Sequence, residues 1–340
     1  MTLNMGWIGC GRHATQMLLP QLARAGMRIG ALCDVNENAL TEAAAQFGVK
    51  RTTTDWQELV AMSGLDALCM AVGPDIHHKA AMAAIDHGLP VFMEKPPAAD
   101  HARTLEIAQA SSRTGIPVFV GFMKRYSTAN KMAGNILRGD EFGPVHGITG
   151  TYMTAPTYFE GEPDFTGFYL HHCIHYMDLM PWLAGSPLED MDAHVCEAGK
   201  GKLLIHLGFS CASGAIGTIV MGTIQSRGTP MEAITVMGDH QRLEMTNVIN
   251  LSWFRNPPFK ADYPDAILDS AQDTLAWTPN FTAAANEDHK GYQALLVDVA
   301  KSITSGRTTA PTIADGAEAM KWLDRMRNLV EAARSNSHAS

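Results

Sequence analysis

The chain of 340 residues is longer than a usual single domain, and its 46% of hydrophobic residues can fill a substantial core, so we expect two globular domains. A formal net charge of −9 provides no electrostatic footprint for a phosphate backbone and argues against nucleic acid as a partner. No run of about 18 apolar residues occurs and no basic, apolar leader opens the chain, so we expect neither a membrane span nor export.

The six cysteines are scattered through the sequence without any Cys-x-x-Cys spacing. Several of them lie in apolar, strand-like runs, where a thiol packs as a small hydrophobic group. Unpaired thiols are typical of a reducing compartment. We therefore expect a cytoplasmic protein.

The first third of the chain alternates short apolar runs with longer helical patterns, which is typical of βαβ units that build a parallel sheet. A doubly wound sheet of this kind holds its ligand beyond the carboxyl ends of the strands. Glycines just after the helical patterns predict where the helices end. The predicted strands are residues 5–8, 29–33, 67–71, 91–93 and 118–121, and the predicted helices include residues 77–87 and 100–114.

A glycine-rich segment, Gly9-Cys10-Gly11-Arg12-His13-Ala14, follows the first predicted strand and opens a helical pattern, giving G-x-G-x-x-A. In dinucleotide-binding loops the first glycine permits a tight turn and the second lets the backbone approach the pyrophosphate. The N-terminus of the following helix then holds the phosphates. Gly9, Gly11, Arg12 and His13 are therefore candidate cofactor contacts.

Asp34 ends the second predicted strand, where a carboxylate of a dinucleotide-binding domain accepts hydrogen bonds from the adenosine ribose. Neither Arg nor Lys follows Asp34, so a ribose phosphate would be repelled without compensation. The pattern favours NAD over NADP. The alternative is that Asp34 caps a helix that begins near Glu37.

The pattern of apolar and polar residues changes after about residue 122. From there on, pairs of apolar runs lie on either side of short turns, which predicts antiparallel hairpins. We expect a Rossmann domain of residues 1–122 and an α+β domain of residues 123–340. The predicted hairpins are residues 203–209 with 215–221 and residues 234–237 with 242–245. Helices over 289–305 and 313–333, an irregular stretch over 253–286 and a frayed tail from Ser335 complete the prediction.

The segment Phe92-Met93-Glu94-Lys95-Pro96-Pro97 resembles the Gfo/Idh/MocA family of oxidoreductases, the relatives of glucose-fructose oxidoreductase and inositol dehydrogenase. The hallmark of that family is Glu-Lys-Pro at the end of a Rossmann strand. Residues 72–77, 120–126 and 170–179 are similar to further family segments, and the resemblance spans roughly residues 4–330. It implies NAD as cofactor, an open and mainly antiparallel sheet in the second domain, and assembly into homodimers or homotetramers through the face of that sheet away from its helices.

The resemblance also assigns roles around the Glu-Lys-Pro segment. It implies that Lys95 lies beside the reacting oxygen, where a cation stabilises developing negative charge and where burial lowers the lysine pKa. The alternative is a surface lysine paired with Glu94. Arg125 is a candidate for contact with cofactor or substrate, or else it forms an ion pair at the domain junction. Further cofactor contacts are implied at Val72, Gly73, His77, Glu94 and Lys95 itself, although Val72 and Gly73 replace the usual Thr and Pro.

A run of histidines forms the second candidate centre. On an α-helix His171, His175 and Asp178 share one stripe, and His172 and Tyr176 share the adjacent one. The resemblance assigns substrate contact and acid–base work to His175, which suits an imidazole that titrates near neutrality. Related sequences often carry Asp at the position of His171, which leaves the proton relay open. We expect His171 to take part in catalysis and His172 to contact substrate.

Two other interpretations of the histidine run stay open. The histidines are held by structural hydrogen bonds, or they form a metal site from the His-x-x-x-His-x-x-Asp spacing, although the chemistry of the family needs no metal. Aromatic residues around this run can stack on a sugar ring, but core packing is their commoner role. These are Tyr152, Tyr158, Phe168 and Trp182, of which we expect Tyr158 to bind substrate.

The resulting functional prediction is an NAD(P)-dependent dehydrogenase or reductase that acts on CH–OH groups. It transfers a hydride between the nicotinamide and a secondary hydroxyl or ketone of a sugar, cyclitol or related polyol. One alternative is an NAD-dependent glycosidase that uses transient oxidation. Another is a non-catalytic, nucleotide-sensing regulator, against which the presence of Lys95 argues.

Overall fold

The structure is a computed structural model that describes residues 2–161, 164–226, 231–255, 274–278 and 288–338. The chain forms two compact units. The first comprises Met1–Tyr126 and Gly291–Asp324, and the second comprises Ser127–Lys290 and Arg325–Ser340. Residues 291–324, which by sequence were grouped with the second domain, thus pack with the first unit. The domain boundary after residue 122 stays a prediction.

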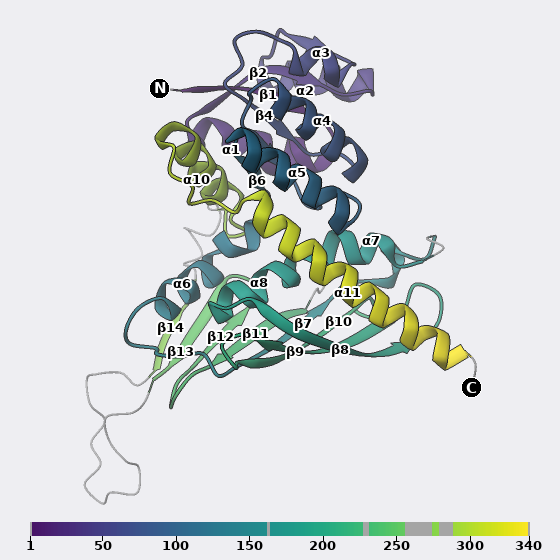
Figure 1. The fold of residues 1–340 in the computed structure, drawn as a ribbon, viewed down its shortest axis with the longest axis vertical. Coiled ribbons are helices and arrows are strands. Elements are labelled where there is room, and N and C mark those ends of the chain that lie inside the picture. The colour runs from purple at the N-terminus through teal and green to yellow at the C-terminus, as the bar shows by residue number, and fades with distance from the viewer. Residues whose placement is uncertain (1, 162–163, 227–230, 256–273, 279–287, 339–340) are drawn as a thin grey trace, which may run out of the picture. The chain divides into compact units, whose positions relative to one another are not determined.

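The first unit holds a six-stranded sheet of parallel strands in the order β3-β2-β1-β4-β5-β6 (Figure 1). Its strands are apolar because both faces of a parallel sheet are buried, and Met5, Trp7 and Phe92 have no exposed surface. The strand order reverses at β1, which is the switch point where such folds bind ligands. The strands are β1 (Leu3–Ile8), β2 (Met27–Cys33), β3 (Thr52–Thr53), β4 (Ala67–Met70), β5 (Val91–Met93) and β6 (Val118–Val120). The predicted α/β Rossmann fold is confirmed.

The helices of the first unit begin and end at the residues that their caps dictate. Pro74 occupies the first turn of α4, where a missing N–H costs nothing, so α4 starts three residues earlier than predicted. Gly115, in the left-handed region, ends α5 as predicted. The α-helices are α1 (Leu19–Leu22), α2 (Glu37–Phe47), α3 (Trp56–Val60), α4 (Pro74–Asp86), α5 (His101–Thr114) and α10 (Tyr292–Ser305). The short elements η1 (Ala14–Leu18) and η2 (Ala23–Ala25) flank α1, and η3 (Met123–Tyr126) follows β6.

The second unit holds an eight-stranded sheet in the order β14-β13-β12-β11-β7-β10-β9-β8. β7 pairs with β10 in parallel and every other neighbouring pair is antiparallel, so both predicted hairpins and the open, mainly antiparallel sheet are confirmed. The strands are β7 (Gly147–Met153), β8 (Leu188–Glu197), β9 (Leu203–Cys211), β10 (Ile216–Gly222), β11 (Met231–Met237), β12 (Arg242–Thr246), β13 (Asn250–Phe254) and β14 (Thr274–Trp277).

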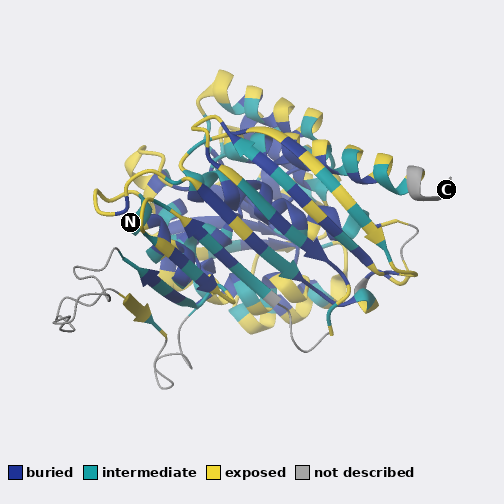
Figure 2. Ribbon diagram, turned by 90° about the horizontal axis from the view of Figure 1, so that it is seen from below, coloured by how far each residue is buried: buried dark blue, intermediate teal, exposed yellow. Residues whose placement is uncertain are grey.

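Burial alternates along the strands of this second sheet, as in β7, where Ile148 is buried and Thr149 is exposed. One face therefore packs against helices while the other stays accessible, and Figure 2 shows buried, intermediate and exposed residues following one another along the strands. The helical elements of this unit are α6 (Thr128–Leu137), η4 (Pro156–Tyr158), α7 (Thr166–Phe168), η5 (Tyr169–Cys173) and α8 (Ile174–Ala184). A long helix, α11 (Ile313–His338), supplies residues to both units.

Two predictions about the C-terminal part of the chain were wrong. The expected frayed tail from Ser335 is helical as far as His338, which is the last residue of α11. The stretch 253–286 was expected to be irregular, but β13 reaches Phe254 and β14 adds an antiparallel strand to it. Apart from Arg255 and Thr278, the remaining residues of that stretch lie outside the described part of the chain.

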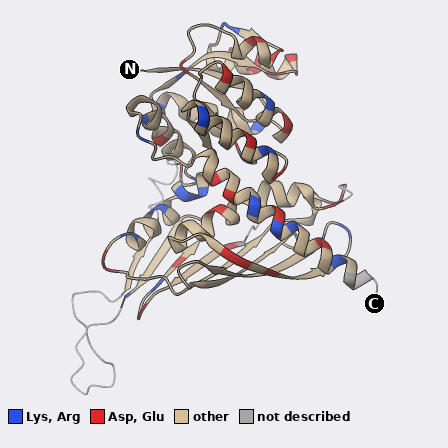
Figure 3. Ribbon diagram, viewed as in Figure 1, with Lys and Arg blue, Asp and Glu red and all other residues tan. Residues whose placement is uncertain are grey.

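Charged residues and cysteines occur in both units. Acidic and basic residues are interspersed along the helices (Figure 3). All six cysteines are free thiols, and five of them are buried. Within the described residues no helix is long and apolar enough to cross a membrane.

Candidate functional site

The glycine loop has the geometry that a dinucleotide requires. Gly9 has a φ of +98°, and a Cβ there would collide with the carbonyl oxygen of Ala71. A Cβ at Gly11 would instead meet nothing within 4 Å, so open space lies beside the second glycine. Helical structure begins at Arg12. The loop therefore offers a close backbone approach and a helix N-terminus to a pyrophosphate, which fits NAD.

Asp34 is held against this loop by backbone hydrogen bonds. Its Oδ2 accepts from the Cys10 N–H at 2.6 Å, and its Oδ1 accepts from the Asn36 N–H at 2.8 Å. The helix α2 is capped by Asn36, whose side chain accepts from the backbone N–H groups of Asn38 and Ala39. The alternative that Asp34 is the helix cap is therefore wrong. A carboxylate fixed beside the glycine loop suits recognition of a ribose diol.

We predict that cofactor preference follows from this carboxylate. The double variant Asp34→Ser, Val35→Arg removes the negative charge and adds a cation at a residue that is 85% exposed, so a ribose phosphate gains a partner. The expected result is that the NAD over NADP preference in kcat/KM falls at least tenfold, or inverts. Dissociation constants for NADH and NADPH provide a second readout. Equal efficiency of the wild type with both cofactors would contradict the role given to Asp34.

His77 is fully buried and joins two loops at the carboxyl edge of the sheet. The Val72 N–H donates to its Nε2 at 3.2 Å, and its Nδ1 lies 2.8 Å from the carbonyl oxygen of Pro96, which requires the Nδ1–H tautomer. The predicted contact of His77 with the cofactor stays a prediction. These contacts favour a positioning role for His77, between the loop after β4 and the Glu-Lys-Pro loop.

Glu94 follows β5 and is buried, with 4% of its surface exposed. Burial raises the pKa of its carboxyl to about 7, against the opposing effects of the Lys95 charge and N–H. His13 Nε2 lies 3.9 Å from Glu94 Oε2. A Cβ at Gly121 would come within 2.6 Å of Glu94 Oε1, so a larger residue would displace the carboxyl. The sequence reasoning missed Gly121, whose signal is a glycine directly after a strand.

Lys95 lies just beyond the carboxyl end of β5, one residue after Glu94. Burial lowers its ammonium pKa, the Glu94 charge opposes this, and the Lys124 charge lowers it further. Lys124 is itself buried, with 7% of its surface exposed. Lys95 itself is half-buried, so the surface lysine paired with Glu94 stays an alternative. A half-buried cation at this edge can stabilise negative charge on a bound oxygen.

The raised pKa of Glu94 makes a prediction about stability. Between about pH 4.5 and pH 7 the folded protein keeps the proton that the unfolded chain loses, so the stability of the wild type falls as the pH rises through this window. Glu94→Gln removes that loss. At pH 8 we expect the variant to gain up to about 3 kcal/mol over the wild type, since one pKa unit is worth about 1.4 kcal/mol, and below pH 4.5 the gain should vanish.

Urea denaturation at a series of pH values measures this gain. Glu42→Gln, at an exposed position of α2, is the control and should show no such trend. A gain for Glu94→Gln that is the same at every pH would contradict the assigned pKa.

Arg125 forms an ion pair within the first unit. Its Nη2 lies 3.0 Å from Asp315 Oδ1, and Asp315 Oδ2 accepts from both the N–H and the hydroxyl of Thr312. The neighbouring Tyr126 hydroxyl donates to Asp298 at 2.5 Å. These contacts anchor the η3 segment to residues near α10 and α11, and they supply a structural partner for Arg125. Contact of Arg125 with cofactor or substrate stays a prediction.

The histidine run of the second unit does not form a regular α-helix. Residues Tyr169–Cys173 make a π-helical turn, in which the Ile174 N–H bonds back to the Tyr169 carbonyl. His171 is exposed whereas His175 has 6% of its surface exposed. The two side chains therefore lie in different environments, unlike two residues on one stripe of a regular α-helix. The extra residue in the turn is the physical reason. The described residues bring together no group of three or more His, Cys, Asp or Glu as a metal site, so the metal interpretation gains no support.

His172 lies in a cluster of aromatic rings. Its Nδ1 is 2.6 Å from the Tyr152 hydroxyl, and the two rings stack at 5.6 Å between centroids. Phe159 and Phe168, both buried, pack against the same imidazole at 5.9 Å. Phe168 thus belongs to the core. The side chain of Tyr158 lies outside the described part of the structure, so its predicted substrate contact stays a prediction.

Trp182, which the sequence analysis grouped with the aromatic residues around the histidine run, contacts the guanidinium group of Arg138. The Arg138 guanidinium carbon lies 4.5 Å from the centroid of its ring. This contact gives Trp182 a structural role between α6 and α8.

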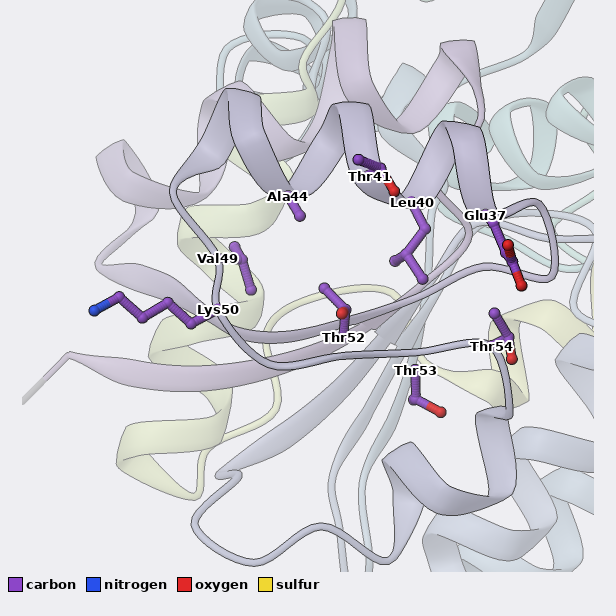
Figure 4. Close-up of a pocket in the computed structure, with 9 residues that line it drawn as sticks. All are labelled: Glu37, Leu40, Thr41, Ala44, Val49, Lys50, Thr52, Thr53 and Thr54. Atoms are coloured by element: carbon purple, nitrogen blue, oxygen red, sulfur yellow. The ribbon is translucent and has the colours of Figure 1, made fainter.

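A polar groove of about 540 Å³ lies at the edge of the first sheet, between α2 and the segment that contains β3 (Figure 4). It is lined by Glu37, Leu40, Thr41, Ala44, Val49, Lys50, Thr52, Thr53 and Thr54. None of the predicted site residues lines it, so it is separate from the glycine loop and Asp34.

Two family models match the chain. Residues 3–122 match the model described as an oxidoreductase family with an NAD-binding Rossmann fold, and residues 136–336 match the C-terminal alpha/beta domain of the same family. Inositol 2-dehydrogenase 2 of Saccharopolyspora erythraea is 30% identical over 196 residues, which cover 57% of each protein. The chain therefore spans a little over half the length of the curated relatives it matches.

Solved structures resemble the chain over nearly its whole length. A dehydrogenase from Chromobacterium violaceum superposes with a TM-score of 0.86 at 20% identity, covering 99% of this chain and 98% of the other. Levoglucosan dehydrogenase, in a complex with NADH and levoglucosan, superposes with a TM-score of 0.84 at 17% identity, covering 98% of both chains. At these identities the likeness establishes the fold.

Proposed function

The chain belongs to the oxidoreductase family whose N-terminal domain is an NAD-binding Rossmann fold, and on this premise we propose that it is a polyol dehydrogenase. It interconverts a secondary hydroxyl and a ketone on a sugar, cyclitol or related polyol. The observation that carries the proposal is the place of Lys95, a half-buried lysine just beyond the carboxyl end of β5, in the unit that also holds the glycine loop and Asp34. A purely nucleotide-binding protein has no need of that cation.

Each protein group has a distinct task in this chemistry. Bound NAD supplies the hydride acceptor for oxidation, and NADH supplies the donor for reduction. Gly9, Gly11 and Asp34 hold the dinucleotide. Lys95 donates a hydrogen bond to the reacting oxygen and stabilises the charge that develops on it. His175 takes the hydroxyl proton while the hydride leaves the carbon, and it returns that proton in the reverse direction.

The substrate class rests on the relatives. Inositol 2-dehydrogenase and levoglucosan dehydrogenase are named for a cyclitol and a sugar derivative, and both share the fold or the family with this chain. Substrates rich in hydroxyls need several hydrogen-bonding groups around the reacting carbon. The polar side chains of the histidine run, His171, His172 and His175, are suited to that task.

We also propose that copies of the chain assemble through the accessible face of the second sheet. An apolar hollow of about 320 Å³ on this face lies between β7 and β10, beside Ile216, which is 67% exposed, and Met237. Apolar side chains at an accessible sheet face favour a protein contact. The free thiols support the proposal of a reducing, cytoplasmic environment.

A substrate screen tests the proposed function. Purified protein is incubated with NAD and a panel of inositols, sugars and sugar acids, and NADH is followed by its absorbance. We expect at least one polyol to be oxidised in proportion to the NADH formed. Tightly retained NAD with bond cleavage and no net NADH would favour the glycosidase alternative. Binding of NADH without turnover of any panel member would contradict the proposal.

A further inference from the structure

Two histidines lie opposite each other on the neighbouring strands β8 and β9 of the second sheet. His194 of β8 and His206 of β9 are partners in the antiparallel register, so their side chains emerge on the same face. Both residues are exposed, whereas Ile205 and Leu207 on either side of His206 are fully buried, which places the pair on the accessible face. The ring centroids are 6.3 Å apart, with 37° between the ring planes.

A carboxylate lies beside this histidine pair. Asp192 is two residues before His194 on β8, so its side chain emerges on the same face. Its Oδ2 lies 3.8 Å from His194 Nε2. The strand partner of Asp192 is Gly208 of β9, where a Cβ would collide with the Asp192 carboxylate. The glycine therefore leaves space for the carboxylate to lie across β9, the strand that carries His206.

The sheet already holds the two histidines at a useful separation. Directly opposite residues of antiparallel strands have Cβ atoms about 4.5–5.5 Å apart. A zinc ion binds an imidazole nitrogen at about 2.0–2.1 Å, so two nitrogens that share an ion lie no more than about 4 Å apart. Because both side chains are exposed, their rings can turn to reach that separation without a movement of either strand. Only two side chains need to become ordered when an ion binds.

The chemistry of these groups matches one class of ligand. Imidazole nitrogen suits Zn²⁺, Cu²⁺ and Ni²⁺, whereas Mg²⁺ and Ca²⁺ prefer oxygen ligands. A carboxylate next to a metal-bound imidazole accepts hydrogen bonds and improves metal affinity. The described residues bring together no three His, Cys, Asp or Glu side chains that could hold a metal by themselves. An ion at this place therefore has two protein ligands and takes water at its other positions.

We propose that His194 and His206 form a surface site for a divalent transition-metal ion, with Asp192 as the carboxylate that accepts hydrogen bonds from the metal-bound water. The site takes Zn²⁺, Cu²⁺ or Ni²⁺ and rejects Mg²⁺ and Ca²⁺. It contains none of the residues proposed for hydride transfer. The inference therefore goes beyond the proposed function, and its test needs no substrate.

Calorimetric titration of the full-length protein with Zn²⁺ tests the site. We expect one Zn²⁺ per chain, and no competition from excess Mg²⁺. His194→Gln and His206→Gln should each weaken binding at least about tenfold, and Asp192→Asn about three- to tenfold, since loss of an outer partner costs less than loss of a ligand. All three positions are exposed, so the fold should be kept, and circular dichroism verifies this.

The number of histidine ligands can be measured with Cu²⁺. Pulsed EPR detects the remote nitrogen of each copper-bound imidazole, and Cys196→Ser protein is used because Cys196 is an exposed thiol that would reduce the ion. At half an equivalent of Cu²⁺ we expect two imidazoles per ion. His194→Gln or His206→Gln should leave one. Two imidazoles in both of these variants would overturn the assignment.

His240→Gln is the matched control. His240 is exposed and its Nε2 lies 3.5 Å from Asp239 Oδ1, but it belongs to the turn between β11 and β12 and so has no partner across a strand. Its Zn²⁺ affinity should equal that of the wild type. The proposal fails if the wild type binds no Zn²⁺, if His240→Gln loses as much as the paired histidines do, or if Cys196→Ser alone abolishes binding. Half a Zn²⁺ per chain would also contradict it, because two copies would then share the ion.

Discussion

Lys95→Ala is expected to lower kcat for polyol oxidation at least a hundredfold while the dissociation constant of NADH changes less than about threefold. Removing one preorganised donor from a developing oxyanion costs about 3 kcal/mol or more, which corresponds to this loss. The fold should survive, because the substitution shortens a half-buried side chain near the charge of Lys124 and buries no new polar group. Stopped-flow measurement of NADH formation separates the chemical step from product release.

Lys79→Ala is the control for this experiment, since it makes the same substitution at an exposed position of α4 in the same unit. Its rate should equal that of the wild type. Lys95→Arg keeps the charge but changes its shape, so we expect partial activity between the other two variants. A near-wild-type rate for Lys95→Ala would return Lys95 to the role of a surface lysine.

His175→Ala is expected to lower kcat by a factor of about 10² to 10⁴, the usual contribution of a positioned acid–base group. His171→Ala should lose less, because its side chain is exposed and water can replace the contacts that it makes. His171→Asp should be tolerated. A carboxylate near His175 would raise the imidazole pKa, so the acid limb of the pH–rate profile should move to higher pH.

The controls for the histidines address fold and metal. His87→Ala, an exposed position after α4, should leave the rate unchanged. Chelator should not affect the wild type, whereas a metal site would give loss of activity with chelator and equal damage from loss of any one ligand. An unimpaired His175→Ala would remove His175 from the acid–base role.

The parts of the site that sequence alone predicted are those coded by local spacing. The glycine loop and Asp34 lie at fixed positions relative to a strand and a helix start, so their proximity follows from one βαβ unit. Lys95 was found because Glu-Lys-Pro ends the strand β5. The hairpins were found because period-two patterns bracket glycine turns.

The parts that sequence did not predict depend on tertiary packing. The contact of Tyr152 with His172 requires the docking of η5 on β7, and the pairing of Tyr152 with Glu232 requires the order of the sheet, where β11 joins β7 rather than β10. The π-helical turn has no composition signal, so the histidine stripe was drawn on regular α-helical spacing. Asn36 rather than Asp34 caps α2, because Asp34 is engaged by the glycine loop.

The central claim is that this chain moves a hydride directly between a polyol carbon and NAD. The measurement that tests it most directly uses a polyol from the substrate panel with deuterium on the carbon that bears the reacting hydroxyl. Incubation with NAD in ordinary water, followed by mass spectrometry of the cofactor, should show one deuterium in the NADH formed and one ketone per NADH. NADH without deuterium, or exchange of the polyol with solvent hydrogen and no net NADH, would contradict the account.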